Sequence, residues 1–396
     1  MKLGLTMAAI AGLAAASAPG AEPPAAEGAA CTRAAVGAAA IGLRSARAGL
    51  IAVPPGEDDT LVDPAAGSRI EETKDRLRDF VRAMMDCAPT SVEPSTLAAA
   101  MAQRAGTDDP EPGPADRHGD RIAYEVSRLE AHPDMLAVVA TLGIRCGSDS
   151  MLMLYGRDGR RWRELMVRRS EPYRKVSGGW GDLRFAVSPP DAQGKWFVAT
   201  VSTTPWCTSA WQRMPYELAR PGPAPDRPKI LFRGENGVYL GNEADMLLKA
   251  EPGAFEIRND GASIDTGILV RRHVRRYEVS GDSVRRVQPV AESVRDFVDE
   301  WIVSPWDEAK DWSGPDPALA RTHARLHPDH YSQLEEFVSI RGCRGGLTQV
   351  EIGAPKGPGW FFLVRGTEKG PWRMEGLARR PHAKCIGVNT LGRVSR

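Results

Sequence analysis

Three groups of side chains in this sequence have types and spacings that could support chemistry, and the first is a set of histidines near the C-terminus. His323 and His327 are four positions apart, and His330 follows three residues later. Histidines at this spacing share one face of a helix and resemble a zinc-binding pair. Pro328 interrupts the helix before His330, and no glutamate stands between the first two histidines. We therefore favour imidazoles exposed at a helix end over a metal site.

The second group is a run of arginines around an expected hairpin. Its members are Arg271, Arg272, Arg275, Arg276, Arg285 and Arg286. On a strand, Arg271 and Arg275 share one side, and Arg272 and Arg276 share the other. Charge on both sides is typical of an exposed sheet edge that is protected against further pairing. The alternative is a binding surface for an anion or a polysaccharide.

The third group combines tryptophans with an acidic residue in two expected loops. Trp180 and Asp182 lie in the first loop, and Trp206 and Trp211 lie in the second. An indole has a large apolar face that suits stacking on a sugar ring. We favour the interpretation that these tryptophans complete the core beside the Cys207 disulfide, and a saccharide site is the alternative hypothesis.

Local catalytic signatures are missing from the sequence. It contains no G-x-S-x-G, H-E-x-x-H, Walker, dinucleotide-binding or EF-hand motif. Carboxylates of the kind that glycosidases pair are available at Asp149, Asp158, Asp182 and Glu217. Their separations do not follow from the sequence, so no catalytic residue and no cofactor are predicted.

Six cysteines indicate how the chain is held together. They are Cys31, Cys87, Cys146, Cys207, Cys343 and Cys385. No two of them form a C-x-x-C pair, which argues against a redox or zinc motif. Their order along the chain favours one bridge per region: 31 with 87, 146 with 207, and 343 with 385. Each bridge would stabilise the fold by on the order of 3–4 kcal/mol by restricting the unfolded chain.

The N-terminus predicts export. Lys2 precedes an apolar run from Leu3 to Ala16, and small residues follow up to Ala21. This layout is typical of a secretory signal peptide over residues 1–21, cleaved between about residues 16 and 22. The run is too short for a permanent membrane span, and we expect no span after it. A periplasmic or secreted location would allow the cysteines to pair.

Composition narrows the class of protein. The 396 residues are 42% hydrophobic and 26% charged, with a formal net charge of +1. These values are ordinary for a soluble globular protein. A chain this close to neutral has no built-in attraction for nucleic acid, so no nucleic-acid partner is expected.

The order of expected elements predicts a mainly β fold with flanking helices. Residues 22–105 form a helical N-terminal segment, and the Pro- and Gly-rich residues 106–119 form a linker. Residues 120–290 form a β-repeat domain, and residues 291–396 form a small α+β unit closed by the last disulfide. In that unit we expect two short helices, over residues 317–326 and 329–339, followed by three strands.

The β-repeat domain divides into three units with room for four antiparallel strands each. Units of this size resemble propeller blades. Three blades are too few to close a ring, so either the C-terminus supplies a fourth or the sheets form an open, sandwich-like stack.

These observations lead to three hypotheses about function. The first is an exported soluble binding or scaffold protein whose partner is a saccharide or an envelope protein. The second is an extracytoplasmic hydrolase acting on a saccharide or envelope polymer through carboxylates at the blade ends. The third is a purely structural envelope protein.

Overall fold

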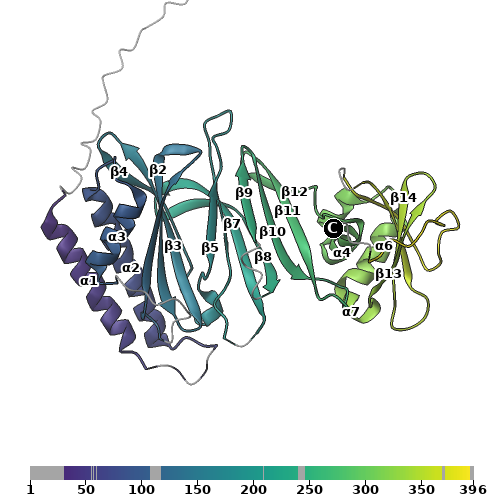
Figure 1. The fold of residues 1–396 in the computed structure, drawn as a ribbon, viewed down its shortest axis with the longest axis horizontal. Coiled ribbons are helices and arrows are strands. Elements are labelled where there is room, and N and C mark those ends of the chain that lie inside the picture. Colours follow the sequence, from purple (N-terminus) through teal and green to yellow (C-terminus); the bar gives the residue numbers. More distant parts are fainter. Residues whose placement is uncertain are drawn as a thin grey trace, which may run out of the picture.

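A computed structural model describes most of the chain after the expected signal peptide. The described residues are 31–54, 56, 58, 60–107, 117–207, 209–239, 246–367 and 371–392. The expected signal peptide and residues 108–116 of the expected linker lie outside them. The fold is mainly β, with four antiparallel four-stranded sheets and flanking helices, as predicted (Figure 1).

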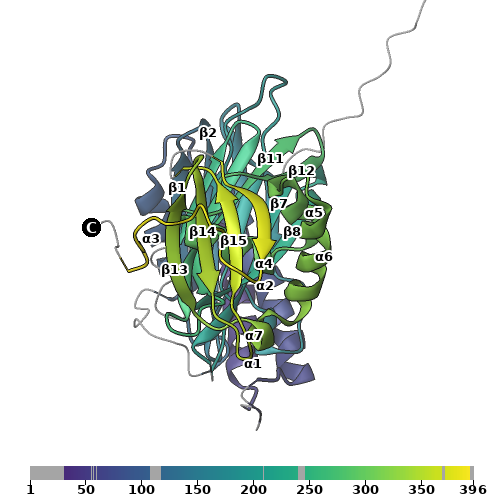
Figure 2. The same ribbon diagram turned by 90° about the vertical axis from the view of Figure 1, so that its right-hand side faces the viewer.

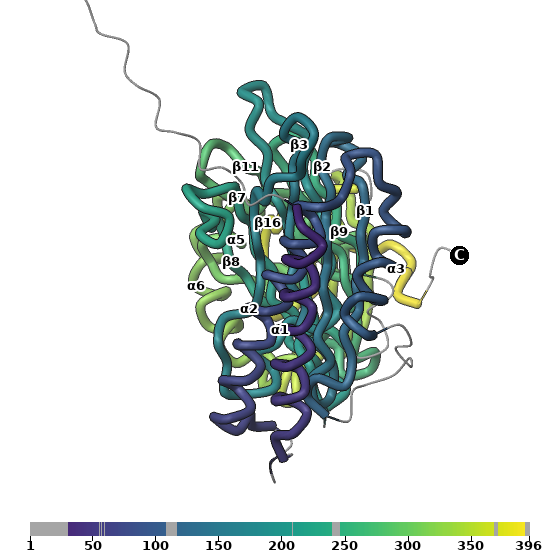
Figure 3. Tube along the Cα trace, turned by 90° about the vertical axis from the view of Figure 1, so that its left-hand side faces the viewer, coloured from purple at the N-terminus to yellow at the C-terminus, as the bar shows by residue number. Residues whose placement is uncertain are grey.

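Three helices begin the described chain: α1 (Arg33–Ile51), α2 (Pro64–Cys87) and α3 (Pro94–Ala105). The Thr32 side chain accepts a hydrogen bond from the first turn of α1, and Asp63 does the same for α2. Gly106 ends α3 with φ = 72°, a conformation that glycine adopts without strain. Figure 3 shows α1 and α2 running alongside each other across one end of the molecule.

Helix α1 is long and apolar enough to cross a membrane, although we expected no such segment after the signal peptide. Its length and mean hydropathy of 1.2 would allow it to cross a membrane, and it is the one described helix for which this holds. In this fold five of its residues are buried instead, where α1 packs on α2 and α3. They are Val36, Ala40, Leu43, Ala46 and Leu50.

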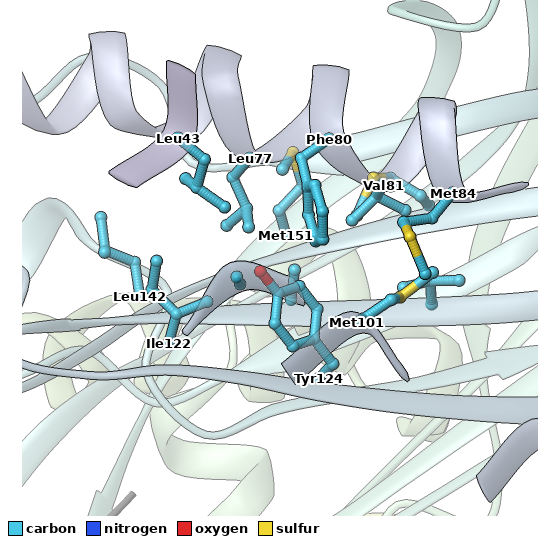
Figure 4. Close-up of a cluster of buried hydrophobic side chains, with 14 of the residues drawn as sticks. Leu43, Leu77, Phe80, Val81, Met84, Met101, Ile122, Tyr124, Leu142 and Met151 are labelled. Atoms are coloured by element: carbon cyan, nitrogen blue, oxygen red, sulfur yellow. The ribbon is translucent and has the colours of Figure 1, made fainter. Parts of the chain in front are cut away.

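The helices cover one face of sheet 1. Its strands are β1 (Ile122–Leu129), β2 (His132–Ile144), β3 (Gly147–Asp158) and β4 (Arg161–Arg169), paired in chain order. Alternate residues of a strand point to opposite faces, and β3 shows the consequence. Met151 packs towards Phe80 and Leu77 of α2 (Figure 4), whereas Leu152 and Leu154 pack towards sheet 2. Both faces of sheet 1 are therefore buried.

Sheets 2 and 3 follow the same meander. Sheet 2 contains β5 (Leu183–Val187), β6 (Val198–Ser202), β7 (Trp211–Ala224) and β8 (Arg227–Tyr239). Sheet 3 contains β9 (Leu247–Glu251), β10 (Ala254–Ala262), β11 (Val270–Ser280) and β12 (Ser283–Val287). An apolar cluster that includes Phe197, Phe255 and Tyr277 fills the space between these two sheets. Stacked sheets with interdigitated inner faces are the packing of a β-sandwich.

The C-terminal region forms a separate core of helices on a fourth sheet. Its main helices are α4 (Val294–Val303) and α6 (Pro317–Leu326), with the short α5 (Trp306–Ala309) and α7 (His330–Gln333). Its strands are β13 (Phe337–Cys343), β14 (Leu347–Ile352), β15 (Trp360–Arg365) and β16 (Arg373–Ala378). The sequence predicted only three strands here and extended a helix over residues 329–339. That helix prediction was wrong beyond Gln333, because pairing with β14 draws the chain from Phe337 onwards into the sheet.

The sheets do not close into a ring. Figure 1 shows them in a row, with the N-terminal helices at one end and sheet 4 at the other, and Figure 2 shows sheet 4 from that far end. The C-terminus does supply a fourth four-stranded sheet, but helices separate it from sheet 3. Of the two predicted arrangements, the structure has the open stack of blade-like sheets.

All three predicted disulfides are present: Cys31–Cys87, Cys146–Cys207 and Cys343–Cys385. Cys146 lies in the turn between β2 and β3, and Cys207 lies in the loop between β6 and β7. Their Cα atoms are 5.1 Å apart. Loops that lean towards each other therefore join sheets 1 and 2, where regular strand positions about 10 Å apart could not.

Candidate functional site

A cleft of about 560 Å³ opens between sheets 1 and 2. Its walls come from the end of β4, from β6, β7 and β8, and from the segment between β4 and β5. We call it the Trp180 cleft, because half-buried Trp180 is the one of the predicted binding residues that lines it. A concave site with an aromatic wall and several polar groups is the usual form of a ligand pocket.

The backbone of Trp180 is fixed by strand β3. Its amide donates to a carboxylate oxygen of Asp149 at 3.0 Å, and its carbonyl accepts from the amide of Ser150 at 2.7 Å. The guanidinium of Arg168 lies over the indole, 5.6 Å from the ring centroid. A tryptophan held in this way offers a preorganised surface for stacking.

A buried ion pair lies beneath this wall. The ammonium of Lys74 is 3.2 Å from Asp149, and both side chains are almost completely buried. Lys74 also donates to the Ser170 hydroxyl at 2.8 Å, and that hydroxyl donates to Asp149 at 2.9 Å. Because a buried charge needs a partner and hydrogen bonds to be tolerated, this network fixes where Asp149 holds the Trp180 backbone. Burial, with Asp149 nearby, raises the pKa of Tyr173 well above its ordinary value.

Charged groups cross the floor of the cleft. Arg168 donates to Glu217 through Nε at 2.5 Å, and both side chains are buried. Arg233 lies 3.5 Å from Glu217 and 3.8 Å from Glu171, with its own side chain more than half exposed. The oxygens of Glu217 are thus held between two guanidinium groups, while Arg233 keeps donors towards the solvent side.

Hydroxyl groups line another part of the cleft. Thr200, Ser202 and Thr204 are all buried there. The Thr204 hydroxyl has no hydrogen-bond partner among the described residues. A buried polar group without a partner carries a free-energy cost that a bound ligand would remove.

Close backbone contacts set the shape of the Trp180 loop. A Cβ atom at Gly178 would lie 2.2 Å from the Cβ of Tyr173, and one at Gly181 would lie 2.7 Å from the Thr203 carbonyl oxygen. The amide of Gly181 also donates to that carbonyl at 2.7 Å. Glycine is needed at both positions because any side chain would push the loop away from its neighbours.

The other residues of the predicted aromatic site lie outside the cleft. Asp182 is exposed and pairs with Arg184 at 3.3 Å. Trp206 is half-buried beside Cys207, and Trp211 packs edge-on against Tyr239, with ring centroids 5.1 Å apart. The three tryptophans and Asp182 therefore do not form one site.

The four acids considered for glycosidase chemistry do not converge either. Glu217 lines the cleft, Asp149 lies beneath it, and Asp158 and Asp182 are exposed on the surface. The carboxylates that share the cleft with Glu217 are Glu171 and Glu235. Sequence reasoning missed Arg168, Arg233 and Thr204, because they lie on β4, on β8 and in the loop after β6, and only the packing of sheet 1 on sheet 2 brings them together.

The structure corrects the interpretation of the arginine run as an exposed edge. Strand β11 is an interior strand, since sheet 3 has the order β12-β11-β10-β9. On one of its faces Arg271 and Arg275 are buried. On the other, Arg272 and Arg276 are half-buried and pair with carboxylates on β10. The sequence predicted correctly that Arg271 and Arg275 face one side of the strand and Arg272 and Arg276 the other. It was wrong to place the strand at an exposed edge, because Arg271 and Arg275 are buried.

Helix α4 explains the burial of Arg271. Its Asp299 and Glu300 carboxylates pair with that guanidinium at 2.9 and 2.5 Å. Arg286 of β12 also pairs with Glu300, at 2.5 Å, and with Glu308, at 2.8 Å. Burial tends to raise the pKa of Glu300, but Arg286 and Arg271 together hold it well below its ordinary value.

The three histidines lie close together in the C-terminal unit. The His323 Nε2 atom is 3.0 Å from the carbonyl oxygens of Trp301 and Ser304, and the His327 Nδ1 atom is 3.0 Å from that of Ile302. His330 contacts the His327 carbonyl through Nδ1, at 2.8 Å. These ring nitrogens lie within hydrogen-bond distance of backbone carbonyl oxygens. No group of three metal-ligating side chains occurs among the described residues. The expectation of exposed imidazoles was wrong, because His323 is buried against α4 and the other two histidines are half-buried. Burial is the first cause that lowers the pKa of His323.

Comparison with known proteins gives no family. No protein-family description matches the chain, and no curated protein matches it. Among solved structures, a mutant α-L-arabinofuranosidase from Fusarium graminearum in complex with an iminosugar inhibitor aligns with a TM-score of 0.26 and 9% identity. The alignment covers 67% of this chain and 64% of the enzyme.

Proposed function

We propose that this chain is an exported binding protein that holds a saccharide in the Trp180 cleft. The observation that carries the proposal is a cleft of about 560 Å³ that combines a fixed, half-buried indole with the buried Thr204 hydroxyl, which has no hydrogen-bond partner in the described part of the chain. A sugar ring has an apolar face, which can stack on the indole, and a rim of hydroxyls, which can hydrogen-bond to the Thr204 hydroxyl. Three disulfides support an oxidising location, outside the cytoplasm.

The size of the cleft limits the ligand. A volume of about 560 Å³ falls within the range of pockets that enclose small ligands. Arg233 and Glu235 at the cleft are more than two-fifths exposed, so a longer chain could extend past them into solvent. We therefore propose an oligosaccharide, of which one or two residues enter the cleft.

A glycan-array screen of the mature chain, followed by calorimetric titration of the best ligand, tests this proposal. Trp180→Ala should weaken binding at least about 5-fold, because stacking on an aromatic ring contributes on the order of 1 kcal/mol or more. Trp211→Ala is the matched control, since Trp211 is exposed outside the cleft. Equal losses in both variants, or no glycan bound by the wild type, would contradict the proposal.

A saccharide hydrolase is the second candidate, because three carboxylates line the same cleft: Glu171, Glu217 and Glu235. Against it, both Glu217 oxygens contact arginines, and a glycosidase needs one carboxylic acid to donate a proton. Release of reducing ends from array-positive glycans would favour the hydrolase, provided that Glu217→Gln abolishes it. Stoichiometric binding without turnover favours the binding protein.

A further inference from the structure

A second cavity, of about 430 Å³, lies where sheets 2 and 3 meet the C-terminal helices. Tyr216 of β7 and Tyr277 of β11 line it and join their hydroxyls at 2.9 Å. Helix α4 contributes Glu300, and Tyr331 of α7 lies at the rim with 60% of its surface exposed. The cavity therefore opens to solvent next to a buried interface.

Arg275 is the exceptional residue of this cavity. It lines the cavity and is 93% buried, given its exposed fraction of 7%. Its polar contacts are the amide oxygen of Asn259 at 3.4 Å and the Nδ1 atom of His273 at 3.3 Å. Within the described residues no carboxylate lies within 4.0 Å of this guanidinium, whereas Arg271 and Arg286 each have two.

His273 does not compensate the charge of Arg275. Its Nε2 atom is 2.9 Å from the carbonyl oxygen of Ala262, which can only accept, so Nε2 carries the hydrogen. Burial, together with Arg271, lowers the pKa of His273 to about 3, and the ring is neutral at pH 7. Its Nδ1 atom accepts a hydrogen bond from Arg275 at 3.3 Å and also lies 3.3 Å from a carboxylate oxygen of Glu300. The ring itself carries no negative charge, so the nearest one belongs to Glu300.

We propose that Arg275 binds the carboxylate group of a small ligand in this second cavity. A guanidinium is a rigid fork of donors that matches a carboxylate in shape. A single charge is the closest match, because Arg275 is the one arginine among the described lining residues that has no carboxylate within 4.0 Å. Glu300, which pairs directly with Arg271 and Arg286, acts on Arg275 only from farther away. The carboxylates of Glu300, Glu308 and Glu235 also border the cavity and would repel a dianion such as phosphate more strongly.

Carboxylate binding at Arg275 does not require saccharide binding in the Trp180 cleft. The two cavities share Tyr216 and Glu235, but Trp180 and Arg275 lie on opposite sides of sheet 2, because the cleft faces sheet 1 and the second cavity faces sheet 3. A failure of saccharide binding at Trp180 would therefore leave carboxylate binding at Arg275 intact, and the reverse also holds.

Thermal unfolding of the full mature chain with added propionate, glucuronate or phosphate, at constant ionic strength with chloride, tests the proposal. The wild type should show a saturable rise in Tm of about 2 °C or more with the carboxylates. Arg275→Met should lose this rise, with affinity at least about 10-fold lower. It should remain folded, because the change costs only two long hydrogen bonds, to Asn259 and His273, and Glu300 keeps its direct pairs with Arg271 and Arg286.

Three further variants test whether the rise in Tm with carboxylates depends on the Arg275 side chain itself, on its charge alone or on the Trp180 cleft. Arg272→Met is the matched control, on the adjacent position of β11 but on the opposite face, and should bind as the wild type does. Trp180→Ala should also bind carboxylates normally. Arg275→Lys keeps the charge without the fork and should bind at an intermediate level. Unchanged binding in Arg275→Met, no saturable effect in the wild type, or an equal response to phosphate would overturn the proposal.

Discussion

Lys74 is the single side chain on which the wall of the Trp180 cleft depends most. Its partner Asp149 holds the Trp180 amide, and both charged groups are buried. The strength of such a pair shows when one member is removed, because the other charge is then left buried and unpaired.

We expect Lys74→Met to lower the free energy of unfolding by about 3–5 kcal/mol and to weaken saccharide binding. Urea denaturation and titration of the array-positive glycan measure the two effects. Lys229→Met is the control, because its pair with Asp282 is more than half exposed and should contribute less than about 1 kcal/mol. Similar losses of stability in both variants would show that the buried network around Lys74 contributes no more than an exposed ion pair.

His273 gives the protein a defined response to pH. In the unfolded chain a histidine gains its proton near pH 6.5, but the folded-state pKa of His273 is lowered to about 3. Between these values the unfolded chain holds a proton that the folded chain does not. The free energy of unfolding therefore falls as the pH is lowered from 6.5, by up to about 1.4 kcal/mol per pH unit for this one group.

Replacement of His273 by Gln should flatten this dependence, because glutamine does not titrate. Urea denaturation at pH 7, 6 and 5 provides the comparison. Burial also lowers the pKa values of His118 and His323, so some pH dependence should remain in the variant. Identical slopes for the variant and the wild type would argue against a neutral, buried His273.

Among the larger elements, the loop that carries Trp180 depends on close backbone contact with the chain after β6. We expect Gly181→Ala to lower the free energy of unfolding by about 1–3 kcal/mol, the usual cost of overpacking, and to reduce saccharide affinity. Its new Cβ would lie 2.7 Å from the Thr203 carbonyl oxygen. Chemical denaturation and calorimetry measure both effects.

Gly342→Ala is the control for this loop, because a Cβ at Gly342 would have nothing within 4 Å. Its stability should change by less than that of Gly181→Ala, and saccharide binding should be unchanged. Normal binding by the Gly181 variant would show that the position of the loop does not determine affinity.

At the level of the whole molecule, the three disulfides and the expected signal peptide make a joint prediction about export. The product isolated from the periplasm or medium should begin between about residues 17 and 23 and should contain no alkylatable thiol before reduction. N-terminal sequencing and mass spectrometry of alkylated protein provide both readings. Six free thiols in the folded protein, or an intact leader, would contradict export.

Much of the fold could be predicted locally. Helices α2 and α6 and most strands follow from hydrophobic periodicity, because each element buries one stripe or one face. Strand β13 could not be predicted in this way. Its residues lie in a segment with an acceptable helical pattern, and the pairing with β14, which needs the folded sheet, decides the outcome.

The candidate sites were less accessible to local reasoning. Trp180 was found because an indole in a glycine-rich loop stands out. Glu217 was found as one of four candidate carboxylates. Arg168, Arg233 and Thr204 come from three other segments of the chain, and nothing in their neighbourhoods singles them out. Arg275 was found for its charge, but its burial depends on α4 and sheet 2, which are distant in sequence.

The sequence by itself determined the β-rich meanders and the disulfide pairing, because strand alternation and the order of cysteines are properties of the chain. Only the tertiary structure decided that the sheets stack in an open row and that one cleft forms beside Trp180. It also decided that Arg275 faces a cavity with no described carboxylate within 4.0 Å of its guanidinium. The reason is physical: burial and charge compensation depend on which distant elements pack together, and no local pattern records that.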